Sequence, residues 1–292
     1  MNAFLARRRS RARGTVTSPA GRIGRGLVNL AAAAGLVYLF LPIFVIVLFS
    51  FNKPKGRFNA VWQEFTLENW ADPFKDRALV DALGVSLRVA GIATVVATFL
   101  GTLMALALVR YRFRGGQVTN LLLVLPLTAP EIVLGASLLT LFLEPHIVLA
   151  NRQFTLGFTT IVLAHIMFCV SYVAMTVKAR LRGFDWTLED AAMDLGATPT
   201  RTFLRVTLPL ITPGILAAAL LSFALSIDDF IITYFVAGPA TTTFPIRIFG
   251  QSRTATPPQI NVLATMILVG SVAVLAAGTA WGRRRARRLG LA

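Results

Sequence analysis

The sequence predicts an all-α membrane protein with six transmembrane helices. Three observations lead to this prediction: the composition, the length of the apolar runs and the placement of the basic residues. Of the 292 residues, 55% are hydrophobic and only 14% are charged, whereas soluble domains carry about 25% charged residues. A chain of this size with so few charges cannot present a water-compatible surface, so we expect it to fold in a bilayer.

Six segments are long enough to cross a membrane, since a spanning helix needs about 20 mainly apolar residues. Each segment is an uninterrupted or nearly uninterrupted apolar run, and the prolines beside Glu131 predict a kink within residues 118–143. The segments are residues 27–51, 83–109, 118–143, 156–177, 210–236 and 260–281. They divide the chain into a basic tail expected to be disordered (1–26), a first helix with its outer loop (27–82), a core domain (83–281) and a second basic tail (282–292).

The first span follows an arginine-rich start, which is also typical of a secretory signal peptide. A signal core holds about 7–15 apolar residues, and this run holds about 25, so we expect a retained helix. In the outer loop that follows, Trp62, Trp70 and Phe74 are typical of an aromatic belt at the lipid interface. A surface that meets an external partner is the alternative for the same three residues.

The basic residues predict the orientation of the chain. The two tails and the connections after the second and fourth spans hold 20 Lys and Arg residues, against 8 in the other connections. Because Lys and Arg are enriched in cytoplasmic loops, both termini are expected in the cytoplasm. The net charge of +16 would also suit a nucleic-acid binder, but the basic residues occur in short groups between apolar runs. Nucleic acid is therefore not expected as a partner.

No catalytic or metal-binding pattern is evident in the sequence, so we expect a conduit or a binding protein and not an enzyme. A phosphate-binding GxxxxGK[ST] motif is missing, and His146 and His165 do not have the spacing of metal ligands. His165 lies inside a span, where a hydrogen bond to a neighbouring helix is expected and a gating role is the alternative. Cys169, the single cysteine, is expected to pack as a small hydrophobe.

A polar connection, LEDAAMDLGATPTRTFLRVTLPLITPGI (188–215), separates the fourth and fifth spans. Asp190 and Asp194 share a helical face, and Gly196 is placed to end that helix. Pro199 suits the first turn of a second short helix. The pattern predicts a helix–turn–helix on the cytoplasmic side, with a small-residue face that lets another protein approach closely; an ordinary amphipathic connector is the alternative.

This connection resembles the E-A-A-x3-G-x9-I-x-L-P motif in the permease subunits of ABC importers. Asp190 stands in place of Glu and Val206 in place of Ile. The resemblance implies the type I ABC importer permease fold, with a coupling helix in the loop 180–209 that docks on a separate ATPase. The residues that it assigns to ATPase coupling, together with the neighbouring Glu189, are Glu189, Asp190, Ala191, Ala192, Gly196, Leu208 and Pro209.

The same resemblance implies the partners and the location of the chain. Two copies of the ATPase bind ATP and Mg, and this chain itself needs no cofactor. A second permease subunit completes the membrane part, as a heterodimer, and an external solute-binding protein delivers the substrate. The complex is expected in the bacterial inner membrane, in contact with lipid.

Five further segments are similar to the spermidine/putrescine importer permeases, of the second permease type. The similarity extends over about residues 83–281 and does not include the arginine-rich tail. The segments are RYRFRG (110–115), APEIVLGASLLTLF (129–142), LSFALSIDDFIITYFVAGP (221–239), FPIRIF (244–249) and TPPQINVLATM (256–266). The resemblance implies a polyamine substrate; an importer for an opine, an amino-acid derivative or a sugar is the alternative.

Three acids lie inside predicted spans, namely Asp228, Asp229 and the proline-flanked Glu131. A carboxylate at the centre of a bilayer costs about 2.5–3.5 kcal/mol on insertion scales, so we expect at least one of them to face a water-filled path and attract a cation. The alternative for the two aspartates is that one pairs with Arg88 and the other lies near the outer surface. Phe230 and Tyr234, four residues apart, are expected beside that path as a cation–π surface or as ordinary packing.

Overall fold

The computed structural model describes residues 19–111, 113–144 and 155–288. The disorder predicted for the basic tail and the position of His146 therefore fall largely or wholly outside the described residues. The chain divides into two compact units. Unit 1 consists of residues 1–72 and 257–270, and unit 2 of residues 73–256 and 271–292.

Unit 1 contains a long apolar helix and a folded outer loop. Helix α2 (Pro19–Phe49) includes the candidate span Leu27–Phe49, no part of which is buried within the chain. The loop after it is organised by Asn52, which is fully buried. Its side-chain amide donates to Asn59 Oδ1 (2.6 Å) and its carbonyl oxygen accepts from Gln63 N (2.8 Å). This loop is therefore a defined structure, not a loose connection.

One of the loop's predicted belt residues is half-buried in that structure. Trp70, in the short helix α3 (Glu68–Ala71), stacks on Phe51 with 5.5 Å between ring centroids. Its indole Nε1 donates to Ser50 Oγ (3.1 Å). Trp62 remains 40% exposed. The loop thus uses Trp70 to pack its own interior, and Trp62 is left for lipid or for a partner.

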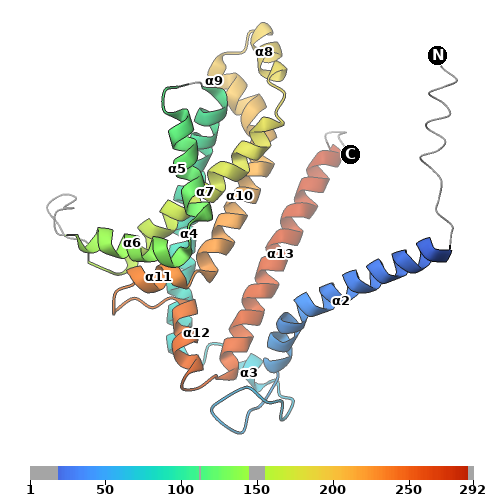
Figure 1. Cartoon of the computed structure of the whole chain (residues 1–292), viewed down its shortest axis with the longest axis vertical. Coiled ribbons are helices and arrows are strands. Elements are labelled where there is room, and N and C mark those ends of the chain that lie inside the picture. The colour runs from blue at the N-terminus through green and yellow to red at the C-terminus, as the bar shows by residue number, and fades with distance from the viewer. Residues whose placement is uncertain (1–18, 112, 145–154, 289–292) are drawn as a thin grey trace. The chain divides into compact units, whose positions relative to one another are not determined.

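The core of unit 2 is formed by three long helices that run side by side (Figure 1). They are α4 (Arg77–Arg110), α7 (Phe158–Arg182) and α10 (Leu208–Asp228). Small residues line the buried face of α4, as is common where membrane helices approach closely. A Cβ added at Gly101 would lie 2.7 Å from Val173 Cγ1. Cys169 is fully buried in this core, as predicted, and its Sγ lies 3.6 Å from Ser222 O.

The third predicted span is not one continuous helix. It consists of α5 (Gly116–Thr128) and α6 (Glu131–Leu143), which are bent by 112°. Pro130 lies at the bend, where it has no N–H to donate and its ring disfavours helix continuation. Among the described residues, five helices are long and apolar enough to span a membrane, or six when the bent pair counts as one. The predicted number agrees with the second count, and the bend agrees with the kink predicted from the prolines beside Glu131.

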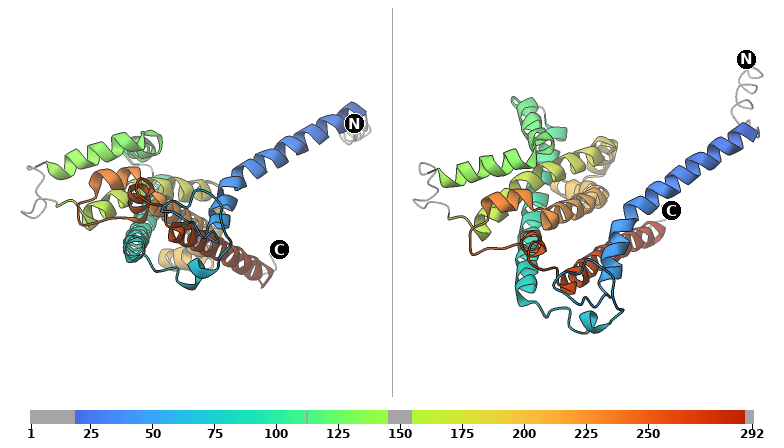
Figure 2. Two further views of the ribbon diagram at one scale, coloured as in Figure 1. Left: turned by 90° about the horizontal axis from the view of Figure 1, so that it is seen from below. Right: turned by 60° about the horizontal axis from the view of Figure 1, so that its bottom comes forward.

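The fifth predicted span is also broken. Helix α10 ends at Asp228, and the short helix α11 (Ile231–Val236) follows after Asp229 and Phe230. Asp229 has an extended ψ of 123°, which ends the helical path. Helix α11 lies beside α6, as Figures 1 and 2 show. The two breaks therefore meet in space, although they are about 100 residues apart in the sequence.

The remaining helices lie at opposite ends of unit 2 (Figure 1). At one end are α8 (Thr187–Asp194), α9 (Pro199–Thr202) and the π-helix η1 (Phe203–Thr207). At the other end α12 (Phe244–Ser252) packs on the start of α4. Phe244 N donates to Ser86 Oγ at 2.9 Å. Helix α13 (Pro258–Arg288) completes the chain.

Candidate functional site

The connection between α7 and α10 forms the predicted helix–turn–helix. Helix α8 ends in a left-handed turn at Gly196, whose φ is +84°. Gly196 N donates to Met193 O (2.9 Å) and Ala197 N to Ala192 O (3.1 Å), the bonds of a glycine C-terminal cap. Thr198 then caps α9 by accepting from Arg201 N (3.4 Å), and Pro199 occupies the first turn. Both predicted helix boundaries are confirmed.

The residues assigned to ATPase coupling do not all lie on one surface. Asp190, Ala191, Gly196 and Pro209 are exposed, and Ala192 and Leu208 are half-buried. Leu195, which the motif leaves unspecified, is 90% exposed at the end of α8. Glu189 is the exception, since it is only 4% exposed. Asp190 and Leu195 are therefore each accessible to a partner, whereas Glu189 points into the chain.

Glu189 is held by Arg110, at the end of α4. The guanidinium makes two contacts with the carboxylate, Nη2 to Oε2 at 2.8 Å and Nη1 to Oε1 at 3.2 Å. Thr207 Oγ1 also donates to Glu189 Oε1. No local pattern indicates this contact, because Arg110 precedes Glu189 by 79 residues and is otherwise typical of a cytoplasmic basic residue.

A second polar cluster lies at the break between α10 and α11. Asp229 caps α11: its Oδ2 accepts from Thr233 N (2.8 Å) and Thr233 Oγ1 (2.7 Å), and its Oδ1 accepts from Ile232 N (3.4 Å). The side chain is only 6% exposed. A carboxylate with this many donors is stabilised where it stands, so Asp229 has a structural role at the break.

His165 on α7 joins the same cluster and is 1% exposed. Its Nδ1 lies 2.6 Å from Ser226 Oγ on α10, and its Nε2 lies 2.9 Å from Thr233 Oγ1 on α11 and 3.4 Å from Asp229 Oδ2. The expected hydrogen bond to a neighbouring helix is confirmed. The ring ties three helices together.

The alternative that Arg88 pairs with one of the two aspartates is wrong, since no ion pair joins Arg88 to Asp228 or Asp229 among the described residues. Arg88 Nε donates to Gly84 O (3.1 Å), and its guanidinium lies 6.0 Å from the centre of the Phe158 ring. Asp229 has His165 and Thr233 instead. Asp229 has these partners for a local reason. The extended backbone at Asp229 turns its carboxylate back onto the start of α11, where backbone N–H groups lack a partner within the helix.

The other two acids are exposed. Asp228 is the last residue of α10 and Glu131 the first of α6. The packing of α6 on α11 brings the two helix ends that carry them close together. Gly135 allows that packing to be close, since a Cβ there would lie 2.6 Å from Phe235 Cδ2. The two exposed carboxylates therefore create a negative potential at the place where both spans are interrupted.

Aromatic rings lie next to these acids. The Phe230 ring is 5.5 Å from that of Tyr234 and 4.8 Å from that of Phe249 on α12. Tyr234 is 60% exposed. Both predicted aromatic residues thus adjoin the break, and Phe249 is an addition that the sequence did not indicate. Ring faces beside carboxylates can contribute to binding of an organic cation.

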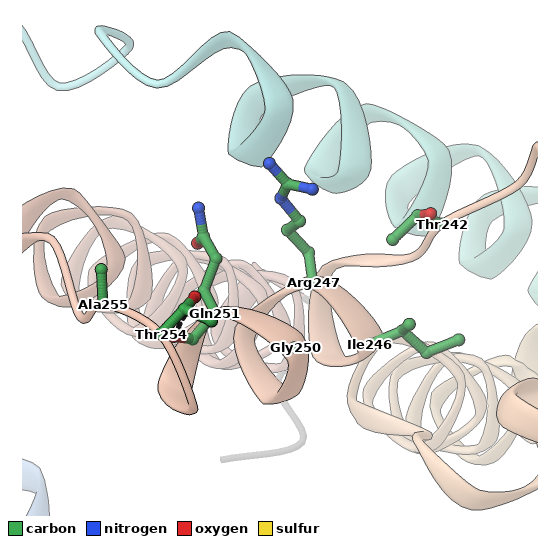
Figure 3. Close-up of a pocket in the computed structure, with 7 residues that line it drawn as sticks. All are labelled: Thr242, Ile246, Arg247, Gly250, Gln251, Thr254 and Ala255. Carbon is green, nitrogen blue, oxygen red and sulfur yellow. Dashed lines mark hydrogen bonds between the residues drawn. The ribbon is translucent and has the colours of Figure 1, made fainter.

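A separate cavity of about 450 Å³ lies at α12 (Figure 3). Arg247 and Gln251 point from α12 toward α4 (Figure 3), and Gln251 Nε2 donates to Asp76 Oδ2 at 3.0 Å. None of the three intramembrane acids lines this cavity. The lining residues are Thr242, Ile246, Arg247, Gly250, Gln251, Thr254 and Ala255. Within the described ranges no group of three or more His, Cys, Asp or Glu residues is arranged to hold a metal ion.

The fold and the helical connection between α7 and α10 define a membrane subunit of a transporter. Residues 97–287 match the family described as binding-protein-dependent transport system inner membrane component, and the chain belongs to that family. It is 42% identical over 245 residues to the putrescine transport system permease protein PotI of Escherichia coli (strain K12), covering 82% of this chain and 85% of that relative. The similarity to the spermidine/putrescine importer permeases, first indicated by five segments, is confirmed.

A second relative and two solved structures extend the comparison. The spermidine/putrescine transport system permease protein PotC of Haemophilus influenzae is 38% identical over 238 residues, covering 82% of this chain and 89% of that relative. A bacterial ABC transporter involved in the import of alginate has a TM-score of 0.68 at 17% identity, over 90% of this chain and 98% of that chain. An amino acid ABC transporter has a TM-score of 0.55 at 18% identity, over 76% of this chain and 100% of that chain. At these identities the structures support the type I ABC importer permease fold alone.

Proposed function

We propose that this chain is a transmembrane subunit of an ATP-driven importer that moves a polyamine, such as putrescine or spermidine, across the bacterial inner membrane. The observation that carries the proposal is the pair of exposed acids, Asp228 and Glu131, at the meeting point of two broken helices. The names of the relatives PotI and PotC support the same class of substrate.

The chemistry of a polyamine fits the residues at the break. Putrescine and spermidine are flexible chains with a positive charge at each end, so each molecule needs more than one anionic contact. Asp228 and Glu131 provide two carboxylates from different helices, and each is costly in a membrane unless a cation or water compensates its charge. Phe230 and Tyr234 provide ring faces for the ammonium groups and for the methylene chain between them.

The energy for transport comes from partners. Asp190 on α8 and Leu195 directly after this helix are both exposed at one end of unit 2, which suits docking on a separate ATPase. Two copies of that subunit bind ATP and Mg, a second permease subunit completes the membrane part, and an external solute-binding protein delivers the polyamine. The excess of Lys and Arg on one side supports cytoplasmic termini.

Uptake of radiolabelled putrescine and spermidine tests the proposal in a host that lacks its own copy of this chain. Uptake is expected to return with the chain, and excess unlabelled polyamine should abolish the signal. Asp228→Asn should raise the KM about tenfold or more, because the contact between the carboxylate and an ammonium group is lost. Asp228→Glu retains the charge and should recover part of the affinity.

The matched control is Asp81→Asn, which removes an exposed acid from α4 away from the break. Its KM should equal that of the wild-type chain. Uptake of a neutral sugar or of an opine, unaffected by Asp228→Asn, would refute the polyamine assignment.

A further inference from the structure

The coupling helix α8 contacts a span to which it is not adjacent in the chain. Covalently, α8 follows α7 and precedes α9, η1 and α10. Arg110, which ends α4, nevertheless holds Glu189 on α8 through two contacts at 2.8 and 3.2 Å. The ion pair is therefore a noncovalent connection from α8 to α4.

The geometry of this ion pair favours a rigid connection. A bidentate guanidinium–carboxylate contact fixes the relative orientation of both groups as well as their distance. The Glu189 side chain is 5% exposed and the Arg110 side chain 36%, so water screens the contact weakly. The Arg110 guanidinium also lies 5.8 Å from the centre of the Trp186 ring, and Trp186 packs edge to face on Phe184 at 4.8 Å.

Thr207 connects the same carboxylate to α10. It is fully buried, and its Oγ1 donates to Glu189 Oε1. Thr207 is the last residue of the π-helix η1, directly before α10. Insertions of π-helix inside membrane helices often occur at functional positions. Glu189 thus joins α8, α4 and the start of α10 at one point.

Helix α4 extends from this point to the opposite end of unit 2. Its 34 residues give a length of about 51 Å at 1.5 Å per residue. At its far end, Asp76 accepts from Gln251 Nε2 on α12 (3.0 Å), and Ser86 accepts from Phe244 N (2.9 Å). A displacement of the Arg110 end would therefore reach α12, and Phe249 of α12 contacts Phe230 at the break.

We propose that Arg110 and Glu189 are positioning residues that form a latch, the Arg110–Glu189 latch, through which movement of α8 is transmitted to α4 and from there to α12. The inference rests on the proposed function, because it requires an ATPase that moves α8. The latch adds a second route for transmitting the movement of α8, beside the covalent route through η1 and α10. Without the latch, α8 can move with the ATPase while α4 stays in place.

The test uses the whole complex, purified through a tag on this chain and reconstituted in proteoliposomes. Glu189→Gln keeps the side-chain shape and a bond to Thr207 but removes the charge. Arg110→Lys keeps the charge but loses the bidentate geometry. Each variant should lower the number of polyamine molecules imported per ATP hydrolysed by about tenfold, the typical size of a coupling between two sites. The KM for polyamine should not change, since neither residue lies at the break.

The double variant distinguishes a latch from two independent effects. Arg110→Lys with Glu189→Gln should lower import per ATP no further than either single change, because residues of one contact are not additive. Arg114→Gln is the matched control, since it removes an exposed basic residue from the same connection, and it should retain wild-type coupling. Full additivity, or unchanged import per ATP in an assembled complex, would refute the latch.

A distance measurement tests the latch without any cargo and without altering its residues. Spin labels at Thr187→Cys on α8 and Tyr111→Cys after α4, both exposed positions, are placed in a Cys169→Ala background. The distance between them should stay constant when ATP binds, because the latch moves both ends together. A change of several ångströms would overturn the inference. If the wild-type complex imports no polyamine, the proposed substrate is wrong, and this distance still decides on the latch.

Discussion

Two pairs of consecutive acids, one in α8 and one at the break between α10 and α11, each contain one buried and one exposed member. In the coupling helix, Glu189 is buried against Arg110 and Asp190 is exposed. At the break of the fifth span, Asp229 is buried against Thr233 and His165 and Asp228 is exposed. In each pair one acid stabilises the fold, and its neighbour is left for a partner or a substrate.

The means of separation differ. Glu189 and Asp190 belong to one regular helix, so a rotation of about 100° per residue turns them to different faces. Asp228 ends a helix and Asp229 is extended, so a break in the backbone separates them. The partners that compensate the buried negative charge also differ. The Arg110 guanidinium pairs with Glu189, whereas backbone N–H groups, the Thr233 hydroxyl and the His165 ring surround the Asp229 carboxylate. Two consecutive acids can therefore have different roles, and their sequence alone does not show which acid has which role.

The largest effect is expected for removal of the buried acid at the break. Asp229→Ala leaves the N–H groups of Ile232 and Thr233 and the Thr233 hydroxyl without their acceptor, which should lower the free energy of unfolding by about 3 kcal/mol. Asp229→Asn keeps one acceptor oxygen and should cost less. Thermal unfolding of the purified chain in detergent measures both. An equal loss in Asp228→Ala would show that the two acids do not differ.

The second effect concerns the turn that presents Asp190. Gly196 has φ of +84° with no described atom within 4 Å of a Cβ position, so the backbone alone requires glycine. Gly196→Val should therefore cost about 1–2 kcal/mol in local strain and lower the import per ATP hydrolysed. Gly196→Asn is the control, because asparagine tolerates the left-handed region. Equal coupling in the valine and asparagine variants would contradict this explanation.

A smaller loss of stability is expected when a neutral member of the cluster is changed. Thr233→Val removes the hydroxyl that lies 2.7 Å from Asp229 Oδ2 and 2.9 Å from His165 Nε2. The cost should be about 1–3 kcal/mol, toward the lower end because Asp229 keeps its backbone donors. Thr233→Ser restores the hydroxyl and should recover most of the stability. A serine variant as unstable as the valine variant would assign the effect to packing instead.

The smallest effect on stability is expected at the exposed member of the coupling pair. Asp190→Asn should change the free energy of unfolding by less than about 0.5 kcal/mol, as is usual for surface substitutions. Its effect should appear as weaker retention of the ATPase during purification of the complex. If Asp190→Asn destabilises the chain as much as Glu189→Gln does, the division of roles in α8 is wrong.

Local sequence features are sufficient to predict the membrane character of the chain, the number of candidate spans and the helix that ends at Gly196. These features depend on local composition, on the spacing of apolar residues and on residues with restricted or permissive backbones, all of which are properties of neighbours in the chain. The prolines around Glu131 also predicted a kink in the third span, where the structure bends by 112°.

Which acid of each pair is buried depends instead on contacts between helices that are distant in the sequence. Arg110 reaches Glu189 across 79 residues of sequence, and His165 reaches Ser226 across 61. Contacts of this kind depend on how α4, α7 and α10 pack, and no local pattern records that packing. Burial of a charge requires a partner at bonding distance. In each pair, the buried acid is therefore the one that faces a partner on a neighbouring helix.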